Sequence, residues 1–515
     1  MNTAVARPVL VHALVLGLVA DLLLRDGPAG IGFPVWVAIL VVSFVALVSR
    51  VERVVPPESR AWLVAAVLFS AGLAWRHSEV LQLLDLLATG ICLAMAAVSR
   101  QDPTWMLLRA RLRDALWAMF HVARSTAAGV VPVAVRARLD AQSVTTGKHD
   151  TRAIARAAAI SAVLLAIFGV LLLRADPIFA SLLSIPQFDI ETALSHIAIF
   201  GFFAWIVGGW TRGALNEEPI APAPERFGFT LSALDITMSL ATLSALFAAY
   251  VGAQLAWFFG GETYLQAQTG LTASAYARRG FFELVWVVVL VVPLLLGTRA
   301  VIGANPAVRR RHTMLSLPLI AMLGAMMISA VLRMRLYVEY YGLTEERFYP
   351  LVFMGWLAVV LVLVTITVLR EHGRFFLAGA ALTGFATLAA LNVADPDVII
   401  ARVNVDRAAA TLSRDAAGLD IVHLATLGGE AAELAATAVI SATKSDARER
   451  CIAARELLSR WDPSSRRALR HSEPGGWRAW NAGERRGLAA IGRSSRALRA
   501  VIHATCTRTS PAVQR

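Results

Sequence analysis

Acidic residues inside apolar stretches are the strongest candidates for chemistry in this 515-residue chain. They are Asp21, Asp85, Asp235 and Glu283. An ionised carboxylate at the centre of a bilayer costs on the order of 2.5–3.5 kcal/mol on insertion scales, so an acid kept there usually serves a function. Asp85 lies deepest in its stretch, while the others lie near the ends of theirs. Asp85 and Asp235 are therefore the intramembrane polar candidates. For Asp85 two roles are possible: transport of an ion, or a structural contact that holds two helices together.

A second candidate site is suggested by the tyrosines, because all seven lie between residues 250 and 349. An aromatic belt would distribute tyrosines over both membrane faces and all spans, so this confinement indicates a local surface. The charged and polar residues near it in sequence are Arg278, Arg279, Glu283, Tyr341 and Arg347. We expect this surface either to bind a ligand or to dock the C-terminal tail through ion pairs of Glu283 and Arg347.

Motifs for nucleotide, protease or metal chemistry are missing from the sequence. No G-x-G-x-x-G, G-x-x-x-x-G-K-[ST], H-E-x-x-H or G-x-S-x-G string occurs in a usable context, and the three cysteines form no metal-ligand spacing. Asp176, Asp189 and Glu191 could serve acid–base work on a loop, but Asp176-Pro177 also reads as an ordinary helix cap. We therefore predict no catalytic, cofactor-binding or metal-binding residues.

The composition places these residues in a polytopic membrane protein. The chain is 57% hydrophobic and only 17% charged, whereas soluble domains average about 45–50% and about 25%. Its net charge of +13 is explained by basic loops at a membrane, so no nucleic-acid partner is predicted. Eleven apolar runs can cross a bilayer as helices. They cover residues 8–24, 33–49, 61–75, 79–98, 154–174, 194–211, 232–259, 280–298, 313–333, 350–369 and 375–393. The pair 61–75 and 79–98, joined at Arg76 and His77, could instead be a re-entrant hairpin.

Arginines in the loops predict the orientation. Arg50, Arg53 and Arg60 precede the third run, residues 99–153 carry nine Lys or Arg against four acids, and residues 299–311 are also basic. These loops fall on one side, which the positive-inside rule assigns to the cytoplasm. The N-terminus is then cytoplasmic, and the tail, which begins at Ala394, is extracytoplasmic.

The chain divides into four predicted parts. They are an N-terminal four-span segment (1–98), a cytoplasmic loop with an amphipathic helix (99–153), a seven-span core (154–393) and a small helical domain (394–515). In the last part Asp395-Pro396 begins a helix, and further helices are expected near 419–427, 430–443, 446–461 and 482–505. Cys451 and Cys506 there are either a disulfide or two unpaired thiols. The last 70 residues carry 15 Arg and six acids, which is compatible with an anionic lipid or envelope polymer as partner beside the lipid bilayer, although a solvated basic face without a specific partner is the favoured interpretation.

Several strings resemble a known family. AQLAWFFGG (253–261), GLTASAYARRGFFELV (270–285), YYGLTEERFYPLVFMGWLA (340–358) and ADPDVIIARVNVDR (394–407) occur in order, and RADPIFASLL (174–183) and GWRAWN (476–481) fit too. From about residue 150 onward the chain is similar to bacterial integral membrane proteins of the domain-of-unknown-function 4153 and 4173 families. The resemblance adds Arg402, Asn404 and Arg407 to the candidate surface and implies no activity.

These patterns predict an all-α helical membrane bundle of about 11 spans in the bacterial cytoplasmic membrane, with a C-terminal helical domain outside it. The favoured function is non-enzymatic sensing, scaffolding or envelope interaction. A transporter or channel that uses intramembrane acids and a membrane enzyme that acts on a lipid-linked substrate are the alternatives.

Overall fold

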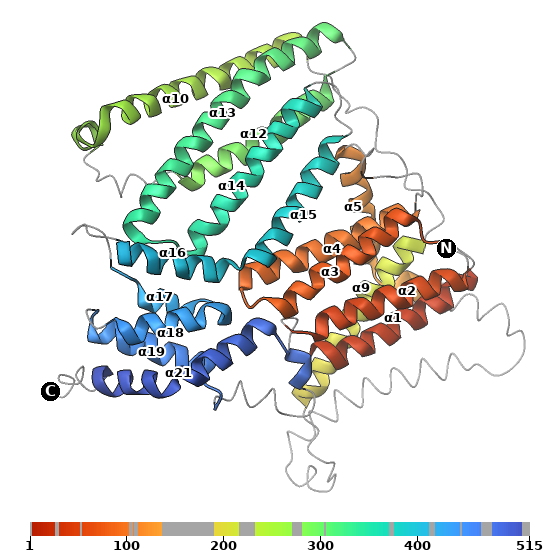
Figure 1. Cartoon of the computed structure of the whole chain (residues 1–515). Helices are drawn as coiled ribbons and strands as arrows, with labels where there is room; N and C mark the ends of the chain where they lie inside the picture. The colour runs from red at the N-terminus through yellow and green to blue at the C-terminus, as the bar shows by residue number, and fades with distance from the viewer. Residues whose placement is uncertain are drawn as a thin grey trace, which may run out of the picture. The chain divides into compact units, whose positions relative to one another are not determined.

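The regular structure of the described residues is entirely helical (Figure 1). The computed structural model describes residues 3–25, 30–51, 54–101, 107, 112–135, 190–215, 232–269, 281–302, 305–369, 375–410, 418–442, 445–464 and 476–506. The longer helices are α1 Thr3–Leu24, α2 Gly32–Arg50, α3 Pro57–Trp75, α4 Glu79–Gln101, α5 Leu112–Ala128, α9 Ile190–Leu215, α10 Ala233–Thr269, α12 Phe281–Val301, α13 Pro306–Tyr341, α14 Glu345–Leu363 and α15 Phe376–Ala394. The π-helical turn Val364–Val368 extends α14.

Nine helices in the described part are long and apolar enough to cross a membrane: α1, α2, α4, α9, α10, α12, α13, α14 and α15. They coincide with nine of the eleven predicted runs, which confirms a multi-pass helical protein. The run 61–75 forms α3, whose 19 residues span about 28 Å, although it is not among the nine. The run 154–174 lies outside the described residues, so the total of eleven remains a prediction.

Two compact units divide the chain. In the first, α1 packs along α9, where Asp21 Oδ2 lies 2.6 Å from Nδ1 of His196. The Arg25 guanidinium also contacts His196 and donates to Ser195 Oγ at 2.7 Å. The candidate acid Asp21 is therefore paired with a histidine of a neighbouring helix.

The second unit contains α3, α4, α10, α12, α13, α14, α15 and the tail. One apolar core joins α10, α12, α13, α14 and α15. A second small cluster, which includes Leu81 and Ala88 of α4 and Leu388 and Leu391 of α15, packs these two helices together. The helices α3 and α4 form a hairpin joined by three residues, Arg76, His77 and Ser78.

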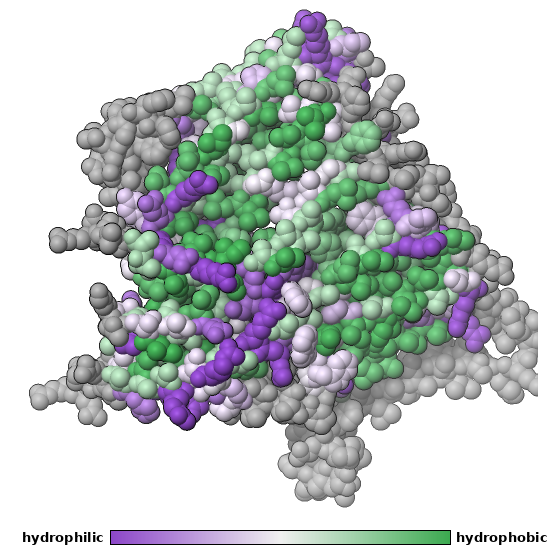
Figure 2. Space-filling model, in the orientation of Figure 1, coloured by the Kyte–Doolittle hydropathy of each residue, from purple (hydrophilic) through white to green (hydrophobic). Residues whose placement is uncertain are grey.

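The tail is a compact helical bundle, as predicted. After α16 Pro396–Ala410 come α17 Ile421–Thr426, the turn Gly429–Ala431, α18 Ala432–Ser441, α19 Ala447–Trp461, the turn Gly476–Ala479 and α21 Ala482–Cys506. We call α17, α18, α19 and α21 with the two short turns the tail bundle. Its core includes Leu343 of the α13–α14 turn and Ile400 of α16. Figure 1 shows α16 running across the ends of α14 and α15, and Figure 2 shows hydrophilic residues gathered along α16 and the tail bundle beside the apolar sides of the spans.

Candidate functional site

Polar side chains from three distant parts of the second unit meet where the spans end. We call this group the polar seam. It consists of Arg76, His77 and Ser78 of the hairpin turn, Asp85 of α4, Asn392, Asp395 and Asp397 around the α15–α16 corner, and Glu430 and Asn481 of the tail bundle.

Arg76 is the centre of the seam and is only 5% exposed. Its Nε donates to the carbonyl oxygen of Asn392 at 2.7 Å, and its Nη2 donates to that of Val393 at 3.1 Å. Its Nη1 forms an ion pair with the Asp395 carboxylate. The last carbonyls of a helix have no intrahelical partner and carry partial negative charge, so a guanidinium satisfies them well. Arg76 thus caps the C-terminus of α15 and fixes the hairpin to it.

Asp85 is fully buried at the membrane side of the seam. Its Oδ1 accepts a hydrogen bond from Nδ2 of Asn392 at 2.9 Å, whereas its Oδ2 has no partner among the described residues. A Cβ added to Gly72 of α3 would lie 2.1 Å from that Oδ2. Only glycine leaves room for the carboxylate here, so α3, α4 and α15 enclose Asp85 together.

The tail bundle reaches the hairpin through Asn481, which is 1% exposed. Its Nδ2 donates to the carbonyl oxygens of Leu73 and Arg76, both at 2.9 Å, and its Oδ1 accepts from the Glu484 amide at 3.0 Å. One side chain therefore caps the C-terminus of α3 and the N-terminus of α21. This contact joins the tail bundle to the end of α3, more than 400 residues earlier in the chain.

A pair of carboxylates lies at the tail side of the seam. Asp397, which is 2% exposed, accepts from the Gly428 amide at 3.0 Å through Oδ2, and its Oδ1 has no partner among the described residues. Glu430 accepts from the His77 amide at 3.2 Å. Burial raises the pKa of Asp397 to about 7, and the carboxylates of Glu345 and Glu430 contribute to the rise. Burial likewise raises the pKa of Glu430. The seam therefore binds protons more tightly than exposed acids do.

A second corner joins α16 to the α13–α14 turn. Asn404 accepts from the Leu343 amide at 2.7 Å and donates to the Leu343 carbonyl at 2.6 Å. Gly342 ends α13 with φ +81°, and a Cβ there would lie 2.5 Å from Asn404 Oδ1. Arg407 donates to the carbonyl oxygens of Glu339 and Gly418 at 3.4 and 3.3 Å. Asn404 and Arg407 of the candidate surface thus hold α16 against the membrane helices.

The other candidate residues have different surroundings. Arg347 donates to the carbonyl oxygens of Tyr341 and Gly342 and lies over the Tyr337 ring at 4.3 Å, so it closes its own turn and forms no hydrogen bond or ion pair with the described residues of the tail. Tyr341, Glu283 and Arg402 are exposed. Arg278 and Arg279 lie outside the described residues.

Asp235, the second intramembrane candidate, lies at the start of α10. Its Oδ2 accepts from the Ser232 amide at 2.8 Å, and its own amide donates to Ser232 Oγ at 3.2 Å. This reciprocal pattern is a helix cap, which exposes Asp235 at a helix end. The structure thus places Asp235 at a helix end, in line with its place near the end of its apolar run.

Sequence reasoning did not assign roles to Arg76, Asp397, Glu430 or Asn481. Three signals were present: the tight turn at Arg76, the string ADPD that contains Asp397, and GWRAWN, which ends at Asn481. The partners of these residues are too far apart in sequence for spacing to reveal the contacts.

Comparison with protein families assigns the chain. The model described as Domain of unknown function (DUF4153) matches residues 63–438. The match begins earlier than the resemblance at about residue 150 and ends within α18, so it contains most of the hairpin, Asp85 and the α15–α16 corner. No curated protein and no solved structure matches the chain. A match over most of the length shows that this multi-pass membrane protein belongs to the DUF4153 family.

Proposed function

We propose that this protein is a non-enzymatic scaffold of the bacterial cell membrane that holds its tail bundle in a fixed position at the extracytoplasmic surface. The observation that carries the proposal is the double cap by Asn481. Because both of its amide hydrogens go to carbonyls of the hairpin, the tail bundle is docked through buried, directional bonds. A domain docked in this way holds its surface at a fixed position relative to the membrane helices. Such a surface suits the binding of other proteins or of the cell envelope.

The outward face of the tail bundle supports an anionic partner. Five arginines of α21 are exposed, whereas its one acid, Glu484, is buried. They are Arg485, Arg486, Arg493, Arg496 and Arg499. Arg493 and Arg499 pair with Glu433 and Asp462, which leaves a basic face suited to lipid headgroups or an envelope polymer.

Two features support an extracytoplasmic tail. Cys451 and Cys506 form a disulfide with a Cα–Cα distance of 5.3 Å, and disulfides persist in oxidising compartments. The antiparallel order of the helices also places Arg100, Arg299 and Arg309 at the ends of the spans opposite to the seam, which agrees with the positive-inside rule.

The surroundings of Asp85 favour a scaffold over a transporter. Its carboxylate is bonded to Asn392, packed against Gly72 and fully buried. These contacts suit a structural residue that holds α3, α4 and α15 together.

Fixed docking is tested by distance measurement between spin labels. With Cys92 replaced by alanine, labels at Leu83 of α4 and Arg496 of α21, both exposed, are expected to give one narrow distance distribution. The control pair, Arg455 and Arg496, lies wholly within the tail bundle. A broad distribution for the first pair beside a narrow one for the control would contradict the scaffold.

Orientation is tested by reporter fusions in a bacterial host. A fusion at Arg515 is expected to give active alkaline phosphatase and no fluorescence from a green fluorescent protein, while fusions at Asn305 should give the reverse. The reason is that Asn305 and Arg515 are proposed to lie on opposite sides of the membrane. Cytoplasmic fluorescence at Arg515 would make the tail bundle a cytoplasmic domain.

A further inference from the structure

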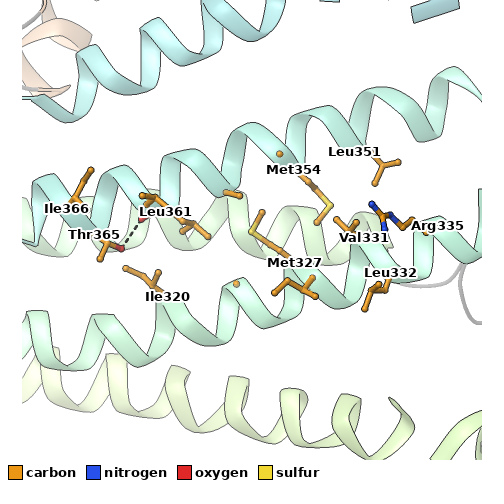
Figure 3. Close-up of a pocket in the computed structure, with 15 residues that line it drawn as sticks. Ile320, Met327, Val331, Leu332, Arg335, Leu351, Met354, Leu361, Thr365 and Ile366 are labelled. Carbon is orange, nitrogen blue, oxygen red and sulfur yellow. Dashed lines mark hydrogen bonds between the residues drawn. The ribbon is translucent and has the colours of Figure 1, made fainter. Parts of the chain in front are cut away.

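An apolar groove of about 840 Å³ lies between α13 and α14 (Figure 3). Every lining residue except Arg335 and Thr365 is apolar. The Thr365 hydroxyl donates to the Leu361 carbonyl at 2.9 Å within its own helix, so it is already satisfied. The volume falls in the range of about 300–1,000 Å³ that is typical of ligand-binding clefts.

The rim of the groove faces outward from the helices. Ile328, Val362 and Ile366 line the groove and are exposed. Both helices are candidate membrane spans, so this face meets lipid chains in a bilayer. Along α13 the lining runs from Ile320 to Arg335, which is about 22 Å at the rise of an α-helix. This length suits an extended acyl chain.

Two glycines create the space. A Cβ added to Gly324 of α13 or to Gly355 of α14 would meet no heavy atom within 4 Å. Larger side chains at these positions would fill the groove without a clash with the backbone. The hollow is therefore a property of these two residues, and it can be closed by substitution.

Arg335 is the one charged residue of the lining, and it lies at the seam end of the groove, next to Leu351 (Figure 3). It is exposed, and no described residue forms a hydrogen bond or ion pair with it. By contrast, the neighbouring Arg333 is buried and donates to Gln254. Arg335 lies six residues before the end of α13 at Tyr341, about 9 Å along the helix, from where a long side chain reaches the headgroup level.

We propose that this groove is a binding site for an anionic phospholipid, which lays one acyl chain between α13 and α14 and places its phosphate against Arg335. The apolar lining removes the chain from the bulk lipid, and the guanidinium fork matches a phosphate with two parallel hydrogen bonds. The lipid comes from the leaflet on the side of the tail bundle. The site is independent of the docking that the proposed function requires.

The test uses the full-length protein, purified in detergent and titrated with phosphatidylglycerol or phosphatidylcholine while retained lipids are counted by native mass spectrometry. Arg335→Gln is expected to weaken phosphatidylglycerol binding about fivefold, because one arginine near an anionic membrane surface contributes an effect of this size. The affinity for phosphatidylcholine should not change. Gly355→Phe should weaken both lipids. The matched controls are Arg402→Gln, at an exposed arginine of α16, and Gly297→Phe, at an open position on α12.

Each outcome decides the proposal. Equal phosphatidylglycerol affinity in wild type and Arg335→Gln would overturn the headgroup contact. Full lipid binding by Gly355→Phe, with Gly324→Phe as a second groove variant, would place the lipid elsewhere. A shift from dimer to monomer caused by either glycine variant would make the groove an interface between two copies of the chain, which also overturns the proposal. Helical content measured by circular dichroism identifies a variant that fails to fold.

Discussion

Replacing Arg76 with methionine is expected to loosen the tail bundle and to lower the free energy of unfolding by about 3–5 kcal/mol. The substitution leaves the Asp395 carboxylate and two carbonyls of α15 without their partner in a partly buried place. Thermal unfolding in detergent and the distance distribution between labels at Leu83 and Arg496 measure the effect.

Two further variants isolate the cause. Arg402→Met removes an exposed arginine from α16 and is expected to change little. Adding Asp395→Asn to Arg76→Met should recover part of the loss, because asparagine tolerates the left-handed backbone at φ 62° and carries no charge. Equal losses in the single and double variants would show that the ion pair does not hold the seam.

Docking is expected to weaken as the pH rises from about 4 to about 8. The pKa of Asp397 is raised from its ordinary value of 3.8 to about 7 in the folded protein, mainly by burial. An acid whose folded-state pKa is raised contributes its full stability below the unfolded value, and the contribution is lost as the pH rises through the folded value. The loss therefore falls between pH 3.8 and about 7, and burial also raises the pKa of Glu430, so this residue contributes a pH dependence of the same sign.

Asp397→Asn tests this dependence. The variant keeps an oxygen for the Gly428 amide but cannot ionise, so its melting temperature should decline less over this pH range than that of wild type. Asp406→Asn, at an exposed position of the same helix, is the matched control. If the pH profiles of wild type and Asp397→Asn coincide, Asp397 does not titrate in the seam.

Much of the fold follows from local sequence. Apolar runs of sufficient length fix the spans, and Gly, Pro and Asp signals fix the ends of the tail helices, so α17, α19 and α21 begin and end within a few residues of the predicted bounds. The Asp395-Pro396 start of α16 was also correct, since Asp395 Oδ1 accepts from the Val398 amide at 3.4 Å. Such signals act over one helical turn, which is why a single sequence reveals them.

The contacts within the candidate site could not be predicted from the sequence, because the partners lie far apart along the chain. The depth of Asp85 could be read from its apolar surroundings, but its partner Asn392 lies 307 residues away. Arg347 was expected to bind the tail. Among the described residues its hydrogen bonds go to the carbonyls of Tyr341 and Gly342, because the tight reversal at Gly342 leaves them within reach of its side chain. The local sequence pattern indicates which polar residues are buried. Their partners depend on how helices far apart in the sequence pack together.

The distances along the chain between seam partners have a consequence for biosynthesis. The hairpin that carries Arg76 and Asp85 leaves the ribosome some 300 residues before Asn392 and Asp395 and some 400 before Asn481. At about 5–20 residues per second, the carboxylate of Asp85 waits roughly 15–60 s for its amide partner. During this interval the bonds of Arg76 and Asp85 to the α15–α16 corner cannot form, so the N-terminal half is an unfinished intermediate. The seam can close only after α21 has been made, because Asn481 at its start supplies the bonds to the α3–α4 hairpin.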